Sequence, residues 1–379
     1  MADWSRRELL GTGAAALIAS SLPGATPGEA SRPAPRPGAD ALDAALEILA
    51  PSGPEFHGGL ANHGPMAAEA LVALDRPEIV VPWVESYRRR LDEKPRGSRP
   101  IVAGEWREAL GDGGRIGDWI AFFEREVEAR GWRGALSEWS ERLAPGIAAA
   151  AFHGAIRTAH AVRSLEEKED AARRRELANG LAYWAARYDP IAEAAAGSRP
   201  VGPPSKAIAS VPILPPERRT HGFITERLAP LDEVPTFPAV AGLADASGDA
   251  SAFLSDLTAT FAGLYLDHAG PGSTIAMIHA VTGPSAVRLI LPHATEPGRR
   301  RLLRYSWQSA AAIYASNALA TPNPRRDAAT PNRAELIEAA VATRDEHGFK
   351  FVEACLREHA IEPNPVYLAA ARDAARRLG

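Results

Sequence analysis

Apolar residues recur every three to four positions along most of this chain, which is the spacing of an amphipathic helix. Strand-like alternation of apolar and polar residues is weak throughout. The pattern therefore predicts an all-α fold, built as a single large multi-helix domain. We expect helices over residues 40–49, 62–74, 79–91, 116–129, 132–143, 147–165, 173–188, 250–265, 273–291, 296–318, 335–359 and 365–377.

The predicted helix 335–359 contains the most informative short stretch of the chain. His347 and Lys350 are three residues apart, so both side chains project from one face of that helix. Gly348 lies between them and costs the helix about 1 kcal/mol relative to alanine. This cost indicates a group that approaches the backbone. Our hypothesis is a buried metal with His347 as a ligand and a chemically modified Lys350 beside it. The alternative is an ordinary histidine and a surface lysine.

The amino-terminal segment is typical of an export signal. Paired arginines, Arg6 and Arg7, precede a weakly apolar run at 11–19 that is too short to span a bilayer. We predict a twin-arginine signal peptide at 1–30, a Pro/Gly/Ala-rich tether at 31–39 and the helical domain at 40–379. The protein would then use the twin-arginine export machinery and be periplasmic or extracellular, without a stable membrane span. A helical anchor or a disordered tail is the alternative for this segment.

Composition narrows the function classes. With 379 residues, 46% apolar and 24% charged, the chain can build one large core or two modest ones, and the Pro/Gly-rich stretch 189–216 could either separate two lobes or cross one helical body. The net charge of -4 gives no indication of a nucleic-acid surface. A single cysteine, Cys355, excludes an intrachain disulfide and a cysteine-based metal cluster. Histidines, helped by carboxylates, must therefore carry any transition-metal site.

Four histidines stand out because small residues follow them directly. His63, His153 and His347 precede glycine, and His279 precedes alanine. Small neighbours leave room for imidazoles to point at a shared centre. Their wide spacing along the chain is not itself a metal-binding motif, so separate buried histidines remain the alternative.

Five short blocks follow one another along 40–360: Asn62-His63-x-Pro65-Met66, His153-Gly154-x-Ile156-Arg157, Leu177-Ala178-x-x-Leu181-Ala182-Tyr183-Trp184, His279-Ala280-Val281-Thr282-Gly283 and His347-x-x-Lys350. Together they make the chain resemble the questin oxidase family of helical oxygenases. The resemblance implies one non-haem iron, Fe(2+), held by histidines from separate helices together with a carboxylated lysine. On this pattern the ligands are His63, His153, His279 and His347, and Lys350 is the modified residue.

The chemistry of this ligand set is coherent. Imidazole suits Fe(II), and a carbamate on Lys350 would replace the carboxylate of the usual facial triad. Lysine reacts with carbon dioxide only as the neutral amine, which burial near a cation favours. Asp345 and Glu346 do not share the face of His347 and Lys350, so they rank lower as ligands. A snorkelling Lys350 is the alternative.

Several other residues are candidates near these ligands. Arg157 and His160 follow His153 by one and two helical turns on the same face, so we predict that they are catalytic and meet a phenolate or enolate oxygen of a substrate. Asn62 and Thr282 could orient neighbouring imidazoles. For each of these residues a buried hydrogen bond without a functional role is the alternative.

These expectations combine into one function. The resemblance implies an oxygenase that acts with dioxygen on an aromatic, quinone-like small molecule, with ring cleavage as one outcome. The family also implies NADPH, but an exported enzyme would not meet cytoplasmic NADPH, and no glycine-rich loop opens a βαβ unit here. One alternative is an exported helical binding protein for apolar small molecules without a working metal site. A second is a zinc hydrolase on the same histidines.

Overall fold

The computed structural model describes residues 38–192, 199–322 and 331–379. The predicted signal peptide at 1–30 and most of the tether at 31–39 lie outside the described residues. The described residues cluster as one compact unit.

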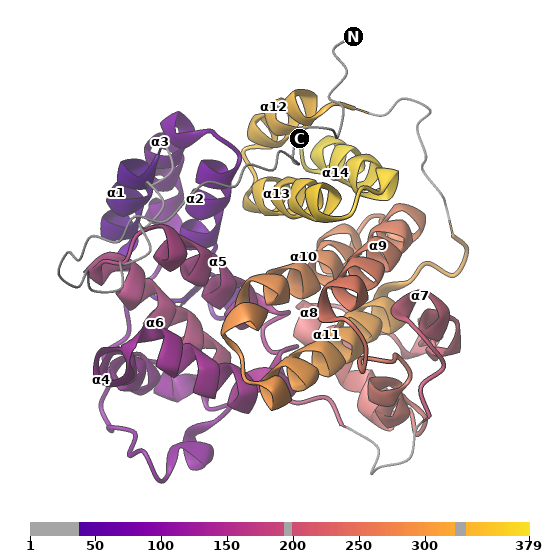
Figure 1. Cartoon of the computed structure of the whole chain (residues 1–379), viewed down its shortest axis with the longest axis horizontal. Coiled ribbons are helices and arrows are strands. Elements are labelled where there is room, and N and C mark those ends of the chain that lie inside the picture. Colours follow the sequence, from indigo (N-terminus) through magenta and orange to yellow (C-terminus); the bar gives the residue numbers. More distant parts are fainter. Residues whose placement is uncertain (1–37, 193–198, 323–330) are drawn as a thin grey trace, which may run out of the picture. The chain divides into compact units, whose positions relative to one another are not determined.

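Helices account for almost all regular structure in the described residues, and the all-α prediction is confirmed. Figure 1 shows them from α1 at the amino-terminal end to α14 at the carboxyl-terminal end. The two strands of the described chain, β1 (Glu55–Phe56) and β2 (Leu60–Ala61), form a short antiparallel hairpin. The helices are α1 (Ala39–Leu49), α2 (Gly64–Ala73), α3 (Pro77–Tyr87), α4 (Ile116–Leu143), α5 (His153–Glu167), α6 (Ala171–Ala186), α7 (Pro204–Ala207), α8 (Ile224–Leu228), α9 (Ala250–His268), α10 (Thr274–Ile290), α11 (Glu296–Asn317), α12 (Arg333–Thr343), α13 (Glu346–Ile361) and α14 (Pro365–Leu378).

The predicted single helix 335–359 is wrong, because the structure divides it into α12 and α13. Arg344 adopts a left-handed conformation (φ 53°), which ends α12. Asp345 then caps α13 by accepting a hydrogen bond from the backbone N–H of His347 at 2.7 Å. A new helix therefore starts at Glu346, directly before His347, and this histidine lies in its first turn.

Two further features of the helices are not given by the periodicity of apolar residues. The predicted helix 147–165 starts only at His153, because Ala150, Ala151 and Phe152 have positive φ angles of 47°, 55° and 67°. In α4 the helical direction changes at Gly131, whose φ of 70° lies outside the helical region. This break corresponds to the gap between the predicted helices 116–129 and 132–143.

Four helices that are distant in sequence form a closed ring of contacts. α2 packs on α5, α5 on α10, α10 on α13, and α13 back on α2. Other helices support the ring from outside: α6 packs on α5, α11 and α9 on α10, α14 on α13, and α1 and α3 on α2. The side chains on the inside of this ring are therefore brought together from positions nearly three hundred residues apart.

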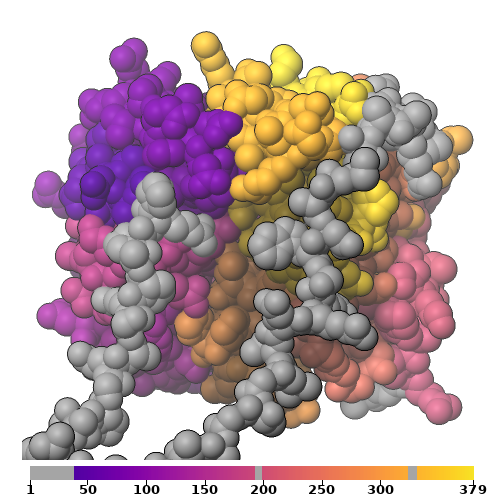
Figure 2. Space-filling model, turned by 45° about the horizontal axis from the view of Figure 1, so that its top comes forward, coloured from indigo at the N-terminus to yellow at the C-terminus, as the bar shows by residue number. Residues whose placement is uncertain are grey.

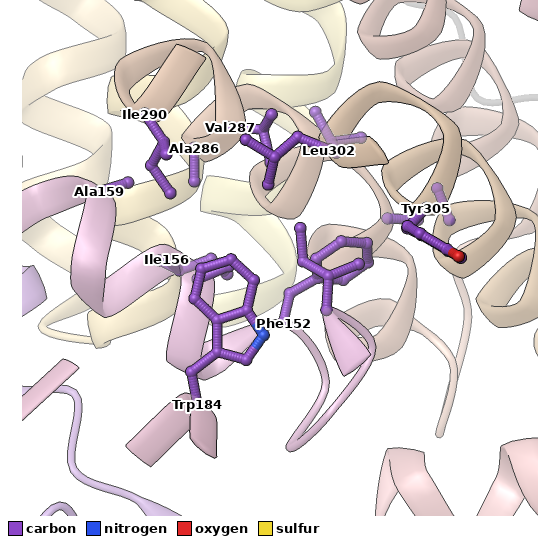
Figure 3. Close-up of a cluster of buried hydrophobic side chains, with 14 of the residues drawn as sticks. Phe152, Ile156, Ala159, Trp184, Ala286, Val287, Ile290, Leu302 and Tyr305 are labelled. Atoms are coloured by element: carbon purple, nitrogen blue, oxygen red, sulfur yellow. The ribbon is translucent and has the colours of Figure 1, made fainter. Parts of the chain in front are cut away.

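Close packing fixes the distance between α5 and its neighbours. Figure 3 shows Phe152 and Ile156 in one buried cluster with Trp184 from α6, Ala286 and Val287 from α10 and Leu302 from α11. A Cβ atom at Gly283 would lie 2.4 Å from the Phe152 ring, and one at Gly154 would lie 2.5 Å from the backbone of Trp184. These two glycines let three backbones approach, which positions the start of α5.

The amino-terminal helices meet α12 and α13 along a polar seam. Trp83 Nε1 donates to the carbonyl of Arg344 at 3.0 Å, and Arg76 forms an ion pair with Glu338. In Figure 2 this seam lies where the indigo surface meets the orange surface. It brings the α12–α13 junction against the helices that follow the first predicted ligand, His63.

One segment of the described chain, Thr274–His293, is long and apolar enough to cross a membrane. Of its most apolar window, 78% is buried inside the protein, as expected for a core helix.

Candidate metal centre

The four histidines singled out from the sequence lie in one cluster inside the helix ring. The Nε2 atom of His153 is 2.6 Å from Nε2 of His63 and 3.0 Å from Nε2 of His279. The ring of His347 lies edge-on to that of His63, with centroids 4.7 Å apart, and 5.5 Å from that of His279. One ligand nitrogen each from His63, His153 and His347 lies within 4.8 Å of the others. Three of these histidines are at most 8% exposed: His63, His153 and His279.

The hydrogen bonds of His153 and His279 determine where their ring protons lie. Nδ1 of His153 contacts the carbonyl oxygen of Ala150, and Nδ1 of His279 lies 2.7 Å from the carbonyl oxygen of Ile275. A carbonyl oxygen can only accept, so each Nδ1 carries the proton. The Nε2 atoms that face each other across 3.0 Å therefore both carry lone pairs.

Carboxylates hold the outer nitrogens of the other two histidines. Nδ1 of His63 lies 3.2 Å from Oε1 of Glu346, which also accepts from Arg90 at 2.8 Å. Nδ1 of His347 lies 3.1 Å from Oδ1 of Asp345. Burial alone would raise the pKa of Asp345, but the hydrogen bond from His347 outweighs this effect, and the pKa is lowered. Both carboxylates thus accept from an outward N–H, in the manner typical of groups behind metal-ligating histidines.

Lone pairs that converge in this way repel one another unless a positive charge lies between them. A proton does not supply it, because burial lowers the pKa of His63, His153 and His279 well below the usual value and neighbouring positive groups lower it further. A cation with an affinity for neutral imidazole would satisfy all of these nitrogens at once. The donor set of this cluster therefore fits a transition-metal ion.

Lys350 lies next to the cluster, one turn after His347. Its side chain is buried at 3% exposure, and its positive charge is among the causes that lower the pKa of His63, His153 and His279. Burial lowers the pKa of Lys350 itself to about 8, against the opposing effect of Glu346. Within the described residues no hydrogen bond or ion pair to the Lys350 ammonium is seen. The observed position does not fit a snorkelling surface lysine.

Local structure holds the backbone at His63 and His153, the two candidate ligands nearest the amino terminus. Three consecutive non-glycine residues in the left-handed region, Ala150 to Phe152, precede His153. Such residues cost about 1–2 kcal/mol each, a strain that folded proteins concentrate at functional sites. The backbone N–H of His63 donates to the hydroxyl of Tyr87 at 2.7 Å, which fixes the entry to α2.

Arg157 and His160 on α5 contact carboxylates of neighbouring helices. Arg157 forms a two-pronged ion pair with Glu176, at 2.5 and 2.8 Å, and Nδ1 of His160 lies 2.6 Å from Oε2 of Glu69. Both line a small cavity with room for about one water molecule. In the described chain no hydrogen bond joins either residue to the four histidines. Their catalytic roles stay predictions.

Asn62 and Thr282 bond to the backbone rather than to an imidazole. Asn62 donates to the carbonyl of Gly53 at 2.8 Å, and Thr282 donates to the carbonyl of Ile278 at 3.1 Å. The reason for a glycine at 348 is also local, because a Cβ there would lie 2.5 Å from the hydroxyl of Thr343 at the end of α12. The close approach inferred at Gly348 is thus the preceding helix.

Sequence reasoning missed the groups that orient the imidazoles. Glu346 directly precedes His347, but it contacts His63, which is 283 residues away. No pattern in the sequence around Glu346 indicates this contact. The carbonyl of Ile275, four residues before His279, could have been named from helical spacing alone. Comparison of the chain with protein-family models and with curated proteins found no match.

Proposed function

We propose that this protein is a non-haem iron oxygenase of the questin oxidase type, acting with dioxygen on an aromatic, quinone-like small molecule. The observation that carries the proposal is the convergence of lone-pair nitrogens from four helices, each imidazole orienting its N–H outward. The resemblance in sequence then selects iron among the metals that imidazole binds.

The ligands would be His63, His153, His279 and His347, with Lys350 as a carbamate. A neutral lysine amine adds to carbon dioxide, forming an N–C bond and losing one proton. A pKa of about 8 leaves about a quarter of the Lys350 side chains neutral at pH 7.5, against about 0.1% for an ordinary lysine. The carbamate would supply the anionic oxygen that four neutral imidazoles lack.

When bound, iron(II) supplies the one-electron chemistry that lets dioxygen react with an organic molecule. The chain's own part is to exclude water from a buried site and to hold the imidazoles through Glu346, Asp345 and the two backbone carbonyls. A dioxygenase draws its electrons from the substrate and needs no nicotinamide, which suits an exported enzyme. We therefore do not include NADPH in the proposal.

Metal analysis of the purified protein tests the proposal. We expect about one iron per chain in the parent, little in His153→Ala, and the parental amount in the control His293→Ala. His293 pairs with Glu166 at 2.8 Å, away from the cluster. Oxygen uptake should then be screened over hydroxylated anthraquinones and simpler phenols.

The outcomes separate the alternatives. Iron that disappears with His153, together with substrate-dependent oxygen uptake, supports the oxygenase. Zinc without oxygen uptake would favour a hydrolase, and no metal in either protein would favour a binding protein for apolar molecules. Either of these results would overturn the proposal.

A further inference from the structure

A second buried polar layer connects the four helices that carry the candidate ligands. Three of them place a network residue six positions after their histidine: Glu69 on α2, Ser285 on α10 and Glu353 on α13. Six residues correspond to about 9 Å along a helix axis. On α5 the network residues are His160 and Arg163, seven and ten positions after His153. We call the set the carboxylate–arginine network; its members are Glu69, His160, Arg163, Ser285, Arg288, Glu353, Arg357 and Glu358.

Arg163 joins α5 to both α2 and α13. Its Nε donates to Oε1 of Glu69 at 2.6 Å, and its Nη2 contacts the other oxygen of the same carboxylate. Its Nη1 contacts Oε1 of Glu353. His160 adds a contact to Glu69 at 2.6 Å. One guanidinium thus sets the separation of three ligand-bearing helices.

The fourth helix is attached through the next turn of α13. Arg357 donates to Oε1 of Glu353 at 3.0 Å and to the backbone carbonyl of Ser285 on α10 at 2.9 Å. The hydroxyl of Ser285 donates to Glu358 at 2.7 Å, and Arg288 of α10 donates to the same carboxylate at 2.7 Å. A continuous chain of contacts therefore runs from α2 through α5 and α13 to α10.

The network is costly to bury, which calls for a reason beyond stability. Glu69, Arg163, Glu353 and Glu358 are at most 6% exposed, and replacing such buried ion groups by apolar residues is often neutral or stabilising in proteins. What apolar residues cannot supply is a fixed distance and direction between helices. One oxygen of Glu353, Oε2, is buried and has no hydrogen-bond partner in the described residues, so the carboxylate is held through Oε1, by Arg163 and Arg357.

We infer that the carboxylate–arginine network is a positioning device for the metal centre: Glu353 and Arg163 hold the four ligand helices at the separation that the histidines need. This inference rests on the proposed metal site. A role in folding alone would predict that any equally buried ion pair affects metal binding to the same extent.

The test compares Glu353→Gln with Asp373→Asn. Asp373 is likewise buried, at 2% exposure, and accepts from Tyr265 at 3.1 Å, but it joins α14 to α9, neither of which carries a candidate ligand. Cobalt(II) alone is the probe: its affinity is measured by competition with a chromophoric chelator, and its visible spectrum reports the ligand geometry. We expect Glu353→Gln to bind cobalt at least about 10-fold more weakly, with a changed spectrum. Asp373→Asn should match the parent in both measurements.

A milder pair of variants covers the case in which Glu353→Gln does not fold. Ser285→Ala removes one hydrogen bond of the network, and Ser306→Ala removes a comparable buried bond, from Ser306 to the carbonyl of Leu302 on α11. We expect only Ser285→Ala to change the cobalt spectrum.

Parental affinity and spectrum in both network variants would overturn the inference while leaving the metal site intact, as would an equal loss in the control variants. If the parent itself binds no cobalt, the proposed metal site fails and the inference fails with it.

Discussion

At the scale of single residues, each imidazole of the candidate metal centre directs its N–H away from the centre. The N–H of each imidazole is engaged by a carbonyl or a carboxylate, so the nitrogens that converge are acceptors. Four neutral imidazoles would carry no charge to balance a divalent cation. Lys350 is the nearby residue whose chemistry can change to supply that charge, since burial lowers its pKa to about 8.

We predict that Lys350→Ala lowers iron affinity by about 10–100-fold and that acetate restores part of it, because the shortened side chain leaves space for a free carboxylate beside the metal. Iron content after dialysis, with and without acetate, measures this. Lys206→Ala on α7, an exposed lysine, serves as the control. An unchanged iron content in Lys350→Ala would argue against a ligand role for the lysine.

At the scale of elements, the starts of three of the helices that carry candidate ligands are specified by different local devices. α13 begins at the cap Asp345, α2 at the Tyr87 contact, and α5 after the left-handed turn Ala150 to Phe152. Glycine would adopt that turn without strain, yet alanine and phenylalanine occupy it. Alanine and phenylalanine make the turn stiffer than glycine would, and the stiffer turn restricts the orientation of His153.

Ala151→Gly should therefore separate stability from metal binding. Relief of the left-handed alanine is expected to raise the free energy of unfolding by about 1 kcal/mol, while the looser turn weakens iron binding by a few-fold. Urea unfolding of the metal-free protein and iron competition assays measure the two effects. The control is Asp75→Gly, which changes a left-handed residue (φ 60°) after α2 and should leave iron binding unchanged. Parallel changes in the two variants would show that the turn has no special relation to the site.

At the scale of the whole molecule, buried ion groups link the ring of helices and make its stability depend on pH. Burial alone would raise the pKa of Glu69, but Arg163 and the hydrogen bond from His160 outweigh it and lower the pKa to about 2. Arg163 likewise lowers the pKa of Glu353 against the effect of burial. A carboxylate with a lowered pKa in the folded state stabilises the fold fully above its unfolded value, 4.5, and this contribution is lost as the pH falls towards 2.

We predict that the free energy of unfolding of Glu69→Gln is lower than that of the parent by roughly 3 kcal/mol at pH 6, which corresponds to the difference between the unfolded and folded pKa of Glu69. This difference in stability should narrow between pH 5 and 2.5. Urea unfolding of metal-free protein across that range measures the gap. The exposed carboxylate Glu338 provides the control, because Glu338→Gln should give a small and nearly constant difference. A gap for Glu69→Gln that stays constant with pH would contradict the lowered pKa.

The sequence by itself determined the helical class, most helix positions and the histidines and lysine worth testing, because these follow from local periodicity, capping and small neighbouring residues. Tertiary structure alone decided that His63 and His347 meet, that Glu346 orients a ring 283 positions away, and that Arg163 links three helices. At the division of the helix predicted at 335–359, it also placed Trp83 against the carbonyl of Arg344, 261 positions away. Periodicity reports which face of a helix is buried, whereas the partners of that face are set by long-range packing, which leaves no trace in the spacing of residues.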